Sequence, residues 1–355
     1  HSPARRPGCR LWGVAGQAGW QGQMMKLSIF EGPKEDRPML ALGLLLFGVS
    51  LLSLQDSLIK LFAPQTSFWQ LQLVRSAFNM LFAVGLAALA GGLHLLWPRR
   101  LGPAVARGIL LATCMLCFFG ASEQITVSQM ATGLYTYPLF ITLLAAPVLG
   151  ERIGPWRIGA LMLGAAGCLL VLDPFSDSGS YFQFVPVFAG FFYACNVLVL
   201  RRYCRNESPL ALAFIVALVF LVTGSMGVIG LESIAVPPDW QQTIPFILTG
   251  WPPLAIGMVG IFACFAVLNL FGNLFLSRAY QTADSSWLAP LDFVYLLFVA
   301  VWSRVLFDNW PTPLAGLGMA MIAAAGVITA VREQRHSPPS RPGAGPPQTG
   351  SGSAG

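Results

Sequence analysis

Residues 150–155 read GERIGP, and residues 307–313 read FDNWPTP. Both stretches follow one apolar run and precede a second that is rich in small residues. In both, an acidic residue precedes a glycine by eight positions: Glu151 precedes Gly159, and Asp308 precedes Gly316. The two copies are 157 positions apart. A duplication of this kind inside an apolar chain predicts a membrane protein built from two related halves.

The composition is that of a protein that crosses the membrane many times. Hydrophobic residues make up 55% of the 355 residues and charged residues 10%, whereas about 25% is usual for soluble domains. Apolar runs of roughly 20 residues recur along the chain, and a helix needs this length to cross a bilayer. The runs are continuous rather than alternating, so an outer-membrane barrel does not fit.

We predict an all-α integral membrane protein with ten transmembrane helices. Their expected ranges are 38–60, 68–92, 104–122, 127–149, 156–173, 183–203, 209–231, 250–277, 285–306 and 313–331. Residues 1–37 are predicted to be disordered, and the true start is expected at Met24, Met25 or Met39. The part before that start would then be translated upstream sequence or a fragment artefact. The Pro-, Gly- and Ser-rich tail at 334–355 is also predicted to be disordered.

Arginines between the spans predict the orientation of the chain. The net charge of +6 lies mostly in short loops, a pattern that sets membrane topology rather than nucleic-acid binding. Alternate loops and the chain ends are basic, whereas the other loops contain only Lys60 and Arg304 near their edges. Both termini are therefore predicted to be cytoplasmic. Five spans in each half then make the second half an inverted copy of the first, with a substrate site between the halves.

Asp56 and Lys60 are the ionisable residues of the first span. Ionisable groups near the bilayer centre cost at least about 2.5–3.5 kcal/mol each on insertion scales, so they are functional candidates. These two are four residues apart and close to the outer interface, where they would share a helix face and pair.

Arg75 lies about two turns into the second span. The same helix face carries Gln72, Ser76 and Asn79. A polar stripe on an apolar span must face protein or water rather than lipid. Two interpretations stay open, namely a structural latch between Arg75 and Asp56 or Glu123, and a contact between Arg75 and substrate.

Asp292 lies about two turns into the ninth span, two residues after Pro290. Proline frees a backbone carbonyl, so the helix is predicted to be broken there. A carboxylate beside a broken helix suits a cationic substrate group or a proton relay, and a hydrogen bond to a neighbouring helix is the structural alternative. The matching part of the fourth span has tyrosines, Tyr135 and Tyr137, and no acid, so the two halves differ in charge.

Amides and tyrosines complete the candidate cavity. Interhelical hydrogen bonds from amides are worth only about 0.6–2 kcal/mol, so packing alone would also explain the asparagines. Tyr135, Tyr137, Tyr193, Trp287 and Tyr295 would suit an aromatic or amphipathic solute. The predicted substrate-binding residues are Arg75, Asn79, Tyr137, Asn196, Asn269, Asn273, Asp292 and Tyr295.

The sequence gives no support to catalysis or metal binding. It has no P-loop, no dinucleotide-binding glycine fingerprint and no nucleophile–base pairing. Its cysteines and histidines form no metal-ligand pattern. We expect no enzyme activity, no cofactor and no nucleic-acid partner. The fifth and tenth spans are rich in Gly and Ala, which predicts close helix packing and a face that a homodimer would use.

Two stretches of the chain resemble the EamA repeat of the drug/metabolite transporter superfamily. The first carries Pro138-Leu139-Phe140, then Leu149-Gly150-Glu151-Arg152, and ends at Leu172-Asp173-Pro174. The second runs from 283–293 through 306–311. The resemblance covers about residues 38–333 and implies a first repeat at 38–174 and a second at 181–333.

The resemblance implies an inner-membrane carrier with two inverted five-helix repeats. Many members export amino acids and other small metabolites, and related members carry S-adenosylmethionine or riboflavin. The stretch from Tyr137 to Phe140 is similar to the S-adenosylmethionine and riboflavin types. Asp308 stands where the family usually has glutamate; we expect Glu151 and Asp308 to cap the next helix rather than to act on substrate.

The function predicted from these features is secondary, ATP-independent transport of a small organic metabolite by alternating access. The expected partners are a small-molecule solute and the lipid bilayer. The alternatives are a non-transporting scaffold or sensor with the same fold, and a membrane enzyme or lipid-handling protein.

Overall fold

A computed structural model describes residues 38–90, 92–149, 155–173, 181–204, 207–234, 236–282 and 289–336. The described helices all belong to one compact unit. The predicted N-terminal segment at 1–37, the tail from 337, Glu151 and Trp287 lie outside the described residues.

The apolar runs fold as helices, because a helix satisfies its own backbone donors and acceptors where no water is present. The long helices are α1 (Pro38–Phe62), α2 (Phe68–Ala90), α3 (Leu101–Gly120), α6 (Pro155–Leu172), α7 (Val185–Tyr203), α8 (Pro209–Ser233), α11 (Ile256–Thr282) and α14 (Pro313–His336). The shorter helices are α4 (Val127–Leu134), α5 (Tyr137–Leu149), α9 (Pro238–Thr243), α10 (Pro245–Leu248) and α13 (Val294–Phe307). Short 3-10 turns are η2 (Ala63–Gln65), η3 (Leu93–Leu96), η4 (Tyr181–Phe184) and η5 (Ala289–Phe293).

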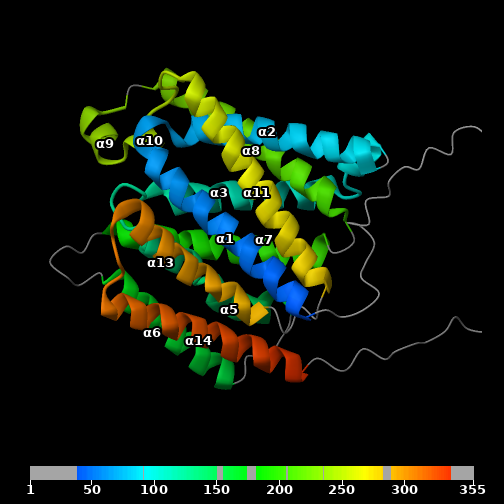
Figure 1. Cartoon of the computed structure of the whole chain (residues 1–355), viewed down its shortest axis with the longest axis vertical. Coiled ribbons are helices and arrows are strands. Elements are labelled where there is room, and N and C mark those ends of the chain that lie inside the picture. Colours follow the sequence, from blue (N-terminus) through cyan, green and yellow to red (C-terminus); the bar gives the residue numbers. More distant parts are fainter. Residues whose placement is uncertain are drawn as a thin grey trace, which may run out of the picture. The chain divides into compact units, whose positions relative to one another are not determined.

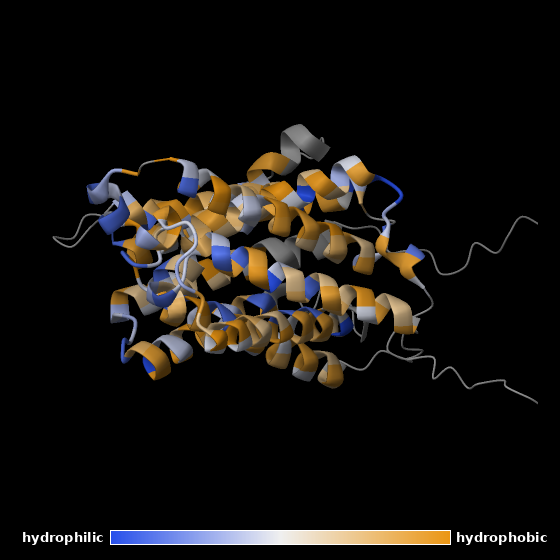
Figure 2. Ribbon diagram, turned by 90° about the horizontal axis from the view of Figure 1, so that it is seen from above, coloured by the Kyte–Doolittle hydropathy of each residue, from blue (hydrophilic) through white to orange (hydrophobic). Residues whose placement is uncertain are grey.

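The structure agrees with a protein that crosses the membrane several times. Within the described residues, six helices are long and apolar enough to span a bilayer, and two more apolar helices are shorter, at Ile158–Leu172 and Pro313–Ile328. Figure 2 shows that hydrophobic residues predominate along the helical ribbons, while hydrophilic residues gather in the connections. Each predicted span has a helical counterpart in the described residues.

Two of the predicted spans are interrupted rather than continuous. The fourth is divided into α4 and α5 at Tyr135 and Thr136. The ninth has the 3-10 turn η5 at Ala289–Phe293, and regular α-helix begins only at Val294. The predicted break near Pro290 is therefore present, and a matching break that the sequence did not predict lies in the other half of the chain.

Helices from the two halves pack in pairs. The most extensive pairings are α1 with α11, α2 with α8, α3 with α7 and α6 with α14, and the last pair lies at the lower edge of Figure 1. Glycines permit the closest approaches. A Cβ on Gly48 would lie 2.9 Å from the Gly272 carbonyl oxygen, and a Cβ on Gly167 would lie 2.6 Å from that of Gly318. The glycine-rich fifth and tenth spans therefore do pack closely, against each other.

Asp308 has a different structural role from the one we predicted. It adopts the left-handed conformation, with φ at 53°, and ends α13 by donating its backbone N–H to the Arg304 carbonyl. Its carboxylate pairs with Arg304 on the exposed surface. The cap of α14 is Thr312, whose hydroxyl accepts the Ala315 N–H at 3.2 Å. The prediction that Asp308 caps the next helix is wrong, because the intervening residues carry the chain away from it.

The C-terminal boundary also differs from the prediction. α14 continues to His336, so residues 334–336, which were assigned to the disordered tail, are helical.

Candidate functional site

The interruptions of the fourth and ninth spans meet inside the helix bundle. The Tyr135 hydroxyl donates to the backbone carbonyl of Asp292 at 3.2 Å. The Tyr137 hydroxyl donates to the Asp292 Oδ2 atom at 3.3 Å. Tyr135 follows α4 directly, and Asp292 belongs to η5, so both partners lie where the α-helical pattern is broken. Irregular backbone at this depth is tolerated where it is enclosed by protein or lines a cavity.

Four tyrosines form the aromatic part of this site. Tyr135 stacks on Tyr295 with ring centroids 5.0 Å apart and an angle of 15°. Tyr137 contacts Tyr135 edge to face at 5.7 Å, and Tyr193 of α7 contacts Tyr137 at 4.9 Å. Aromatic pairs with offset or edge-to-face geometry are worth about 0.5–1.5 kcal/mol beyond their buried area. The rings therefore form one connected group contributed by both halves of the chain.

Asp56 of α1 extends the network from Tyr295. The Tyr295 hydroxyl donates to Asp56 Oδ2 at 2.6 Å, and Gln55 Nε2 donates to Oδ1 at 3.1 Å. The predicted pair between Asp56 and Lys60 is not formed. Lys60 instead donates its ammonium group to the backbone carbonyls of Ser122 and Ile125. The correction arises because each side chain meets a partner from a distant part of the chain, Asp56 from α13 and Lys60 from the connection between α3 and α4, which no spacing along α1 could indicate.

Arg75 is buried close to this network without a partner of its own. It is 5% exposed, and no residue in the described part of the chain accepts a hydrogen bond from its guanidinium. It attracts Asp56 electrostatically, although the two do not form an ion pair. A buried charge that lacks hydrogen bonds is costly, so a partner that the chain itself does not provide would be strongly favoured.

The polar stripe of α2 also contains buried groups that have no hydrogen-bond partner among the described residues. Gln72 is 1% exposed and neither atom of its amide group has a partner among the described residues; the same holds for the Ser76 hydroxyl. These residues lie within one turn of Arg75, so unpaired donors and acceptors are concentrated on one face of α2. Asn79, on the same face, is half-buried.

The predicted asparagines of the other helices do not join the tyrosine network. Asn196 of α7 is 3% exposed, and its Oδ1 atom has no partner in the described residues. Asn273 is exposed and donates to the backbone carbonyl of Asn269 at 2.8 Å, within its own helix α11. Of the predicted residues, the structure brings together Tyr137, Asp292 and Tyr295, with Arg75 nearby.

Three residues of the network were missing from the predicted binding set. Asp56 was assigned to a surface pair, and Tyr135 and Tyr193 were treated only as aromatic residues of a cavity wall. One signal was available: Tyr135 and Asp292 are 157 positions apart, which is the offset between the two copies of the duplicated stretch. Equivalent positions of two repeats often meet near the axis that relates them.

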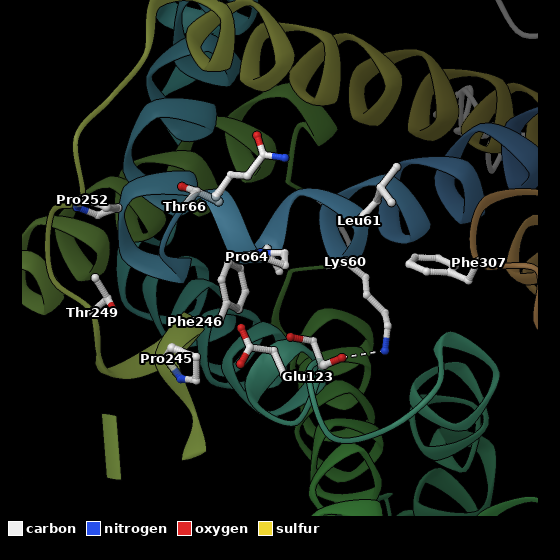
Figure 3. Close-up of a pocket in the computed structure, with 13 residues that line it drawn as sticks. Lys60, Leu61, Pro64, Thr66, Glu123, Pro245, Phe246, Thr249, Pro252 and Phe307 are labelled. Atoms are coloured by element: carbon white, nitrogen blue, oxygen red, sulfur yellow. Dashed lines mark hydrogen bonds between the residues drawn. The ribbon is translucent and has the colours of Figure 1, made fainter. Parts of the chain in front are cut away.

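A separate cavity of about 740 Å³ opens at the end of the bundle where α1 ends (Figure 3). Lys60 and Glu123 are the charged residues of its lining, and Phe246 and Phe307 are among the apolar ones. Asp56, Arg75 and Asp292 do not line it. Within the described residues, no group of three or more His, Cys, Asp or Glu side chains is arranged to hold a metal ion.

A comparison with protein-family models matches one part of the chain. Residues 39–173 match the EamA-like transporter family. The match lies in the first half of the chain, which is therefore similar to this family. This similarity agrees with the resemblance of the sequence motifs in the same stretch.

Curated relatives of this chain are named as transporters. A riboflavin transporter of Rhizobium johnstonii is 26% identical over 279 residues, which span 78% of this chain and 84% of the relative. The pseudopaline exporter CntI of Pseudomonas aeruginosa is 24% identical over 223 residues, which span 62% of this chain and 72% of the exporter. A solved crystal structure covers 82% of this chain and 98% of its own, with a TM-score of 0.50 and 19% identity, and this likeness concerns the fold alone.

Proposed function

We propose that this protein is a secondary transporter that moves a small organic metabolite across a bacterial inner membrane by alternating access. In this proposal ten spans form two inverted five-helix repeats, at 38–174 and 181–333, with both termini in the cytoplasm. The solute binds between the repeats and is exposed to each side in turn. Transport uses a solute or ion gradient, and no enzymatic reaction is part of it.

The pattern of helix packing supports the repeat. If each span corresponds to the one five places later, then α1 corresponds to α7, α2 to α8, α3 to α11 and α6 to α14. When each helix is replaced by its counterpart, the α1–α11 pair becomes the α7–α3 pair. The α2–α8 and α6–α14 pairs are unchanged, because the two helices of each pair are counterparts of each other. The same four pairings are therefore recovered, as expected for halves related by a two-fold axis.

The observation that carries the proposal is the charged network within apolar helices. Asp56 and Asp292 accept hydrogen bonds from Tyr295 and Tyr137, and Arg75 is buried without a partner in the described chain. Ionisable groups within apolar helices are costly against lipid and typically face the bundle interior or a water-filled path. A guanidinium held ready in such a path is suited to bind an anionic or carbonyl group of a solute.

The chemistry of the network suggests a solute with an aromatic and a polar part. The rings of Tyr135, Tyr137, Tyr193 and Tyr295 offer flat surfaces for stacking, while Arg75 and Asp292 offer charges of opposite sign. Riboflavin, S-adenosylmethionine and the aromatic amino acids each have an aromatic and a polar part. The names of the relatives favour testing riboflavin first.

The test begins with ligand binding. Purified protein is screened by thermal shift against riboflavin, S-adenosylmethionine and a set of amino acids, since a ligand that binds the folded state raises its melting temperature. Each ligand that binds is then followed as radiolabelled solute in proteoliposomes. We expect Arg75→Ala and Asp292→Asn to abolish transport while the amount of protein in the liposomes stays normal.

Matched controls change the same types of charge outside the network. Arg304→Ala removes an exposed arginine, and Asp239→Asn neutralises an exposed aspartate of α9. Both controls should transport normally. Normal transport by Arg75→Ala and by Asp292→Asn would refute the proposed site, and no transport of any bound solute by the wild type would favour a scaffold or sensor.

A further inference from the structure

The cavity at the end of α1 has the size of a ligand site. Its volume of about 740 Å³ falls within the roughly 300–1,000 Å³ typical of small-molecule pockets. Its walls come from α1 and η2, the connection between α3 and α4, the segment around α10, and the last residue of α13. The lining residues are Lys60, Leu61, Ala63, Pro64, Gln65, Thr66, Ser122, Glu123, Pro245, Phe246, Thr249, Pro252 and Phe307.

The wall formed by residues 243–252 is fixed in place by hydrogen bonds to other elements. Side chains of the α1–α2 region and of the α3–α4 connection bind four of its backbone carbonyls, at 2.6 to 2.8 Å. The pairs are Gln124 with Thr243, Trp69 with Ile247, Ser67 with Gly250, and Gln70 with Pro252. A connecting segment that is bound at four points forms a preformed wall, which lowers the entropic cost of ligand binding.

Lys60 supplies a cation whose position is fixed. Its ammonium group donates to the carbonyls of Ser122, at 2.6 Å, and Ile125, and it lies 5.9 Å from the centre of the Phe307 ring. Figure 3 shows Lys60 at the side of the cavity, near Phe307, with a dashed line for a hydrogen bond from its ammonium group. An ammonium group has three donors, so one remains for a ligand.

Glu123 supplies a carboxylate that is not committed to another group. Within the described residues it has no hydrogen bond and no ion pair, although it attracts Lys60 electrostatically. It belongs to the connection between α3 and α4, so it lies outside the helical spans. The cavity therefore presents one positive and one negative group that face the same space without being joined.

We propose that this cavity is a second binding site, which takes a small zwitterion with an ammonium and a carboxylate group. The ammonium group contacts Glu123, the carboxylate accepts the remaining Lys60 donor, and the apolar part lies against Phe246 and Phe307. A solute with a single charge would meet one like charge in the cavity and is therefore disfavoured. The proposal concerns a place other than the central network and goes beyond the proposed transport.

The test is isothermal titration of the purified full chain in detergent with three related probes. L-phenylalanine carries both charged groups, phenethylamine only the ammonium, and 3-phenylpropanoate only the carboxylate. We expect L-phenylalanine to bind at least about tenfold more tightly than either analogue, the ratio that corresponds to one lost charge-assisted contact. No binding of L-phenylalanine, or equal binding of all three probes, would overturn the proposal.

The Glu123→Gln variant tests whether L-phenylalanine binds in this cavity. This variant should fold normally, because Glu123 makes no hydrogen bond in the described structure, and it should weaken L-phenylalanine binding at least about tenfold. Affinity for 3-phenylpropanoate should rise, since a like charge has been removed. Asp239→Asn, which changes the same charge outside the cavity, should leave both affinities unchanged. Unaltered binding of L-phenylalanine to Glu123→Gln contradicts the proposal.

Arg75→Gln separates this site from the central one. If L-phenylalanine binding is lost in Arg75→Gln and kept in Glu123→Gln, the probe occupies the central network and the second site is refuted. If binding depends on Glu123 but not on Arg75, the second site stands. It stands even when proteoliposomes show no transport, a result that would count against the proposed function alone.

Discussion

The Tyr135 hydroxyl donates a 3.2 Å hydrogen bond to the backbone carbonyl of Asp292, a residue 157 positions later in the chain. The same offset separates Glu151 from Asp308 in the duplicated stretch. In the proposed repeat these two positions correspond, and they touch each other at the place where the fourth and ninth spans depart from regular helix. They differ in chemistry, a phenol on one side and a carboxylate on the other, so the site at the contact between the halves is asymmetric.

Tyr135→Phe tests this contact. The substitution keeps the ring stacked on Tyr295 and removes one hydrogen bond to a backbone carbonyl, so the free energy of unfolding should fall by about 0.5–1.5 kcal/mol. Chemical unfolding in detergent measures the change. Tyr181→Phe is the control, because Tyr181 is 92% exposed, and it should have no effect. Equal stability of the two variants would show that the bond to Asp292 contributes nothing.

Tyr295 and Asp56 should be energetically coupled. The bond between them is short, at 2.6 Å, and hydrogen bonds to charged groups contribute about 1.5–3 kcal/mol. Tyr295→Phe and Asp56→Asn are made singly and together, and the unfolding free energies form a double-mutant cycle. We expect a coupling of about 1–3 kcal/mol. A coupling close to zero would mean that the two side chains act independently.

Arg75→Met distinguishes a latch from a binding residue. Removal of one partner of a buried ion pair typically costs about 3–5 kcal/mol, whereas removal of an unpaired buried charge costs little or even stabilises. Since Arg75 has no hydrogen-bond partner in the described chain, we expect the free energy of unfolding to stay constant or to rise. Solute transport should be lost at the same time.

The control for that experiment is Arg304→Met, which removes an exposed arginine and should change neither property. A loss of stability of about 3 kcal/mol or more in Arg75→Met would support the latch to Asp56.

Gly318→Ala should weaken the contact between α6 and α14. A Cβ at this position would lie 2.5 Å from the Gly167 carbonyl oxygen, closer than real contacts allow. The helices would have to separate, at a cost of about 1–3 kcal/mol. Gly316→Ala, two residues earlier, meets no atom within 4 Å, so it should be neutral or should stabilise the helix by up to about 1 kcal/mol. Thermal unfolding of both variants compares the two positions directly.

Binding in the second cavity should depend on pH through Glu123. Burial raises the pKa of this carboxyl, and the nearby Lys60 charge partly opposes the shift. The ionised form binds the ammonium group of the probe, so affinity should fall as the pH is lowered towards the raised pKa. The decline should begin at a higher pH than for an ordinary glutamate, whose pKa is about 4.3. Titrations of L-phenylalanine across this range should be steeper for wild type than for Glu123→Gln.

The sequence alone determined the class of the protein and the location of its helices. Membrane helices are continuous apolar runs that satisfy their own backbone, so their positions follow from local composition. The predicted break near Pro290 also follows from a local cause, since proline lacks a backbone N–H group. The duplicated stretches around Glu151 and Asp308 predict two related halves, and this stays a prediction.

The tertiary structure decided which polar groups meet. Asp56 and Lys60 share a helix, yet Asp56 is bound by Tyr295 from α13, and Lys60 by carbonyls before α4. Partners of this kind are brought together only by helix packing, so no spacing within α1 predicts them. The second interruption, at Tyr135 and Thr136, lies between Gly133 and Pro138, so a local signal for it was present in the sequence. Only helix packing decides that Tyr135 there stacks on Tyr295 and binds Asp292.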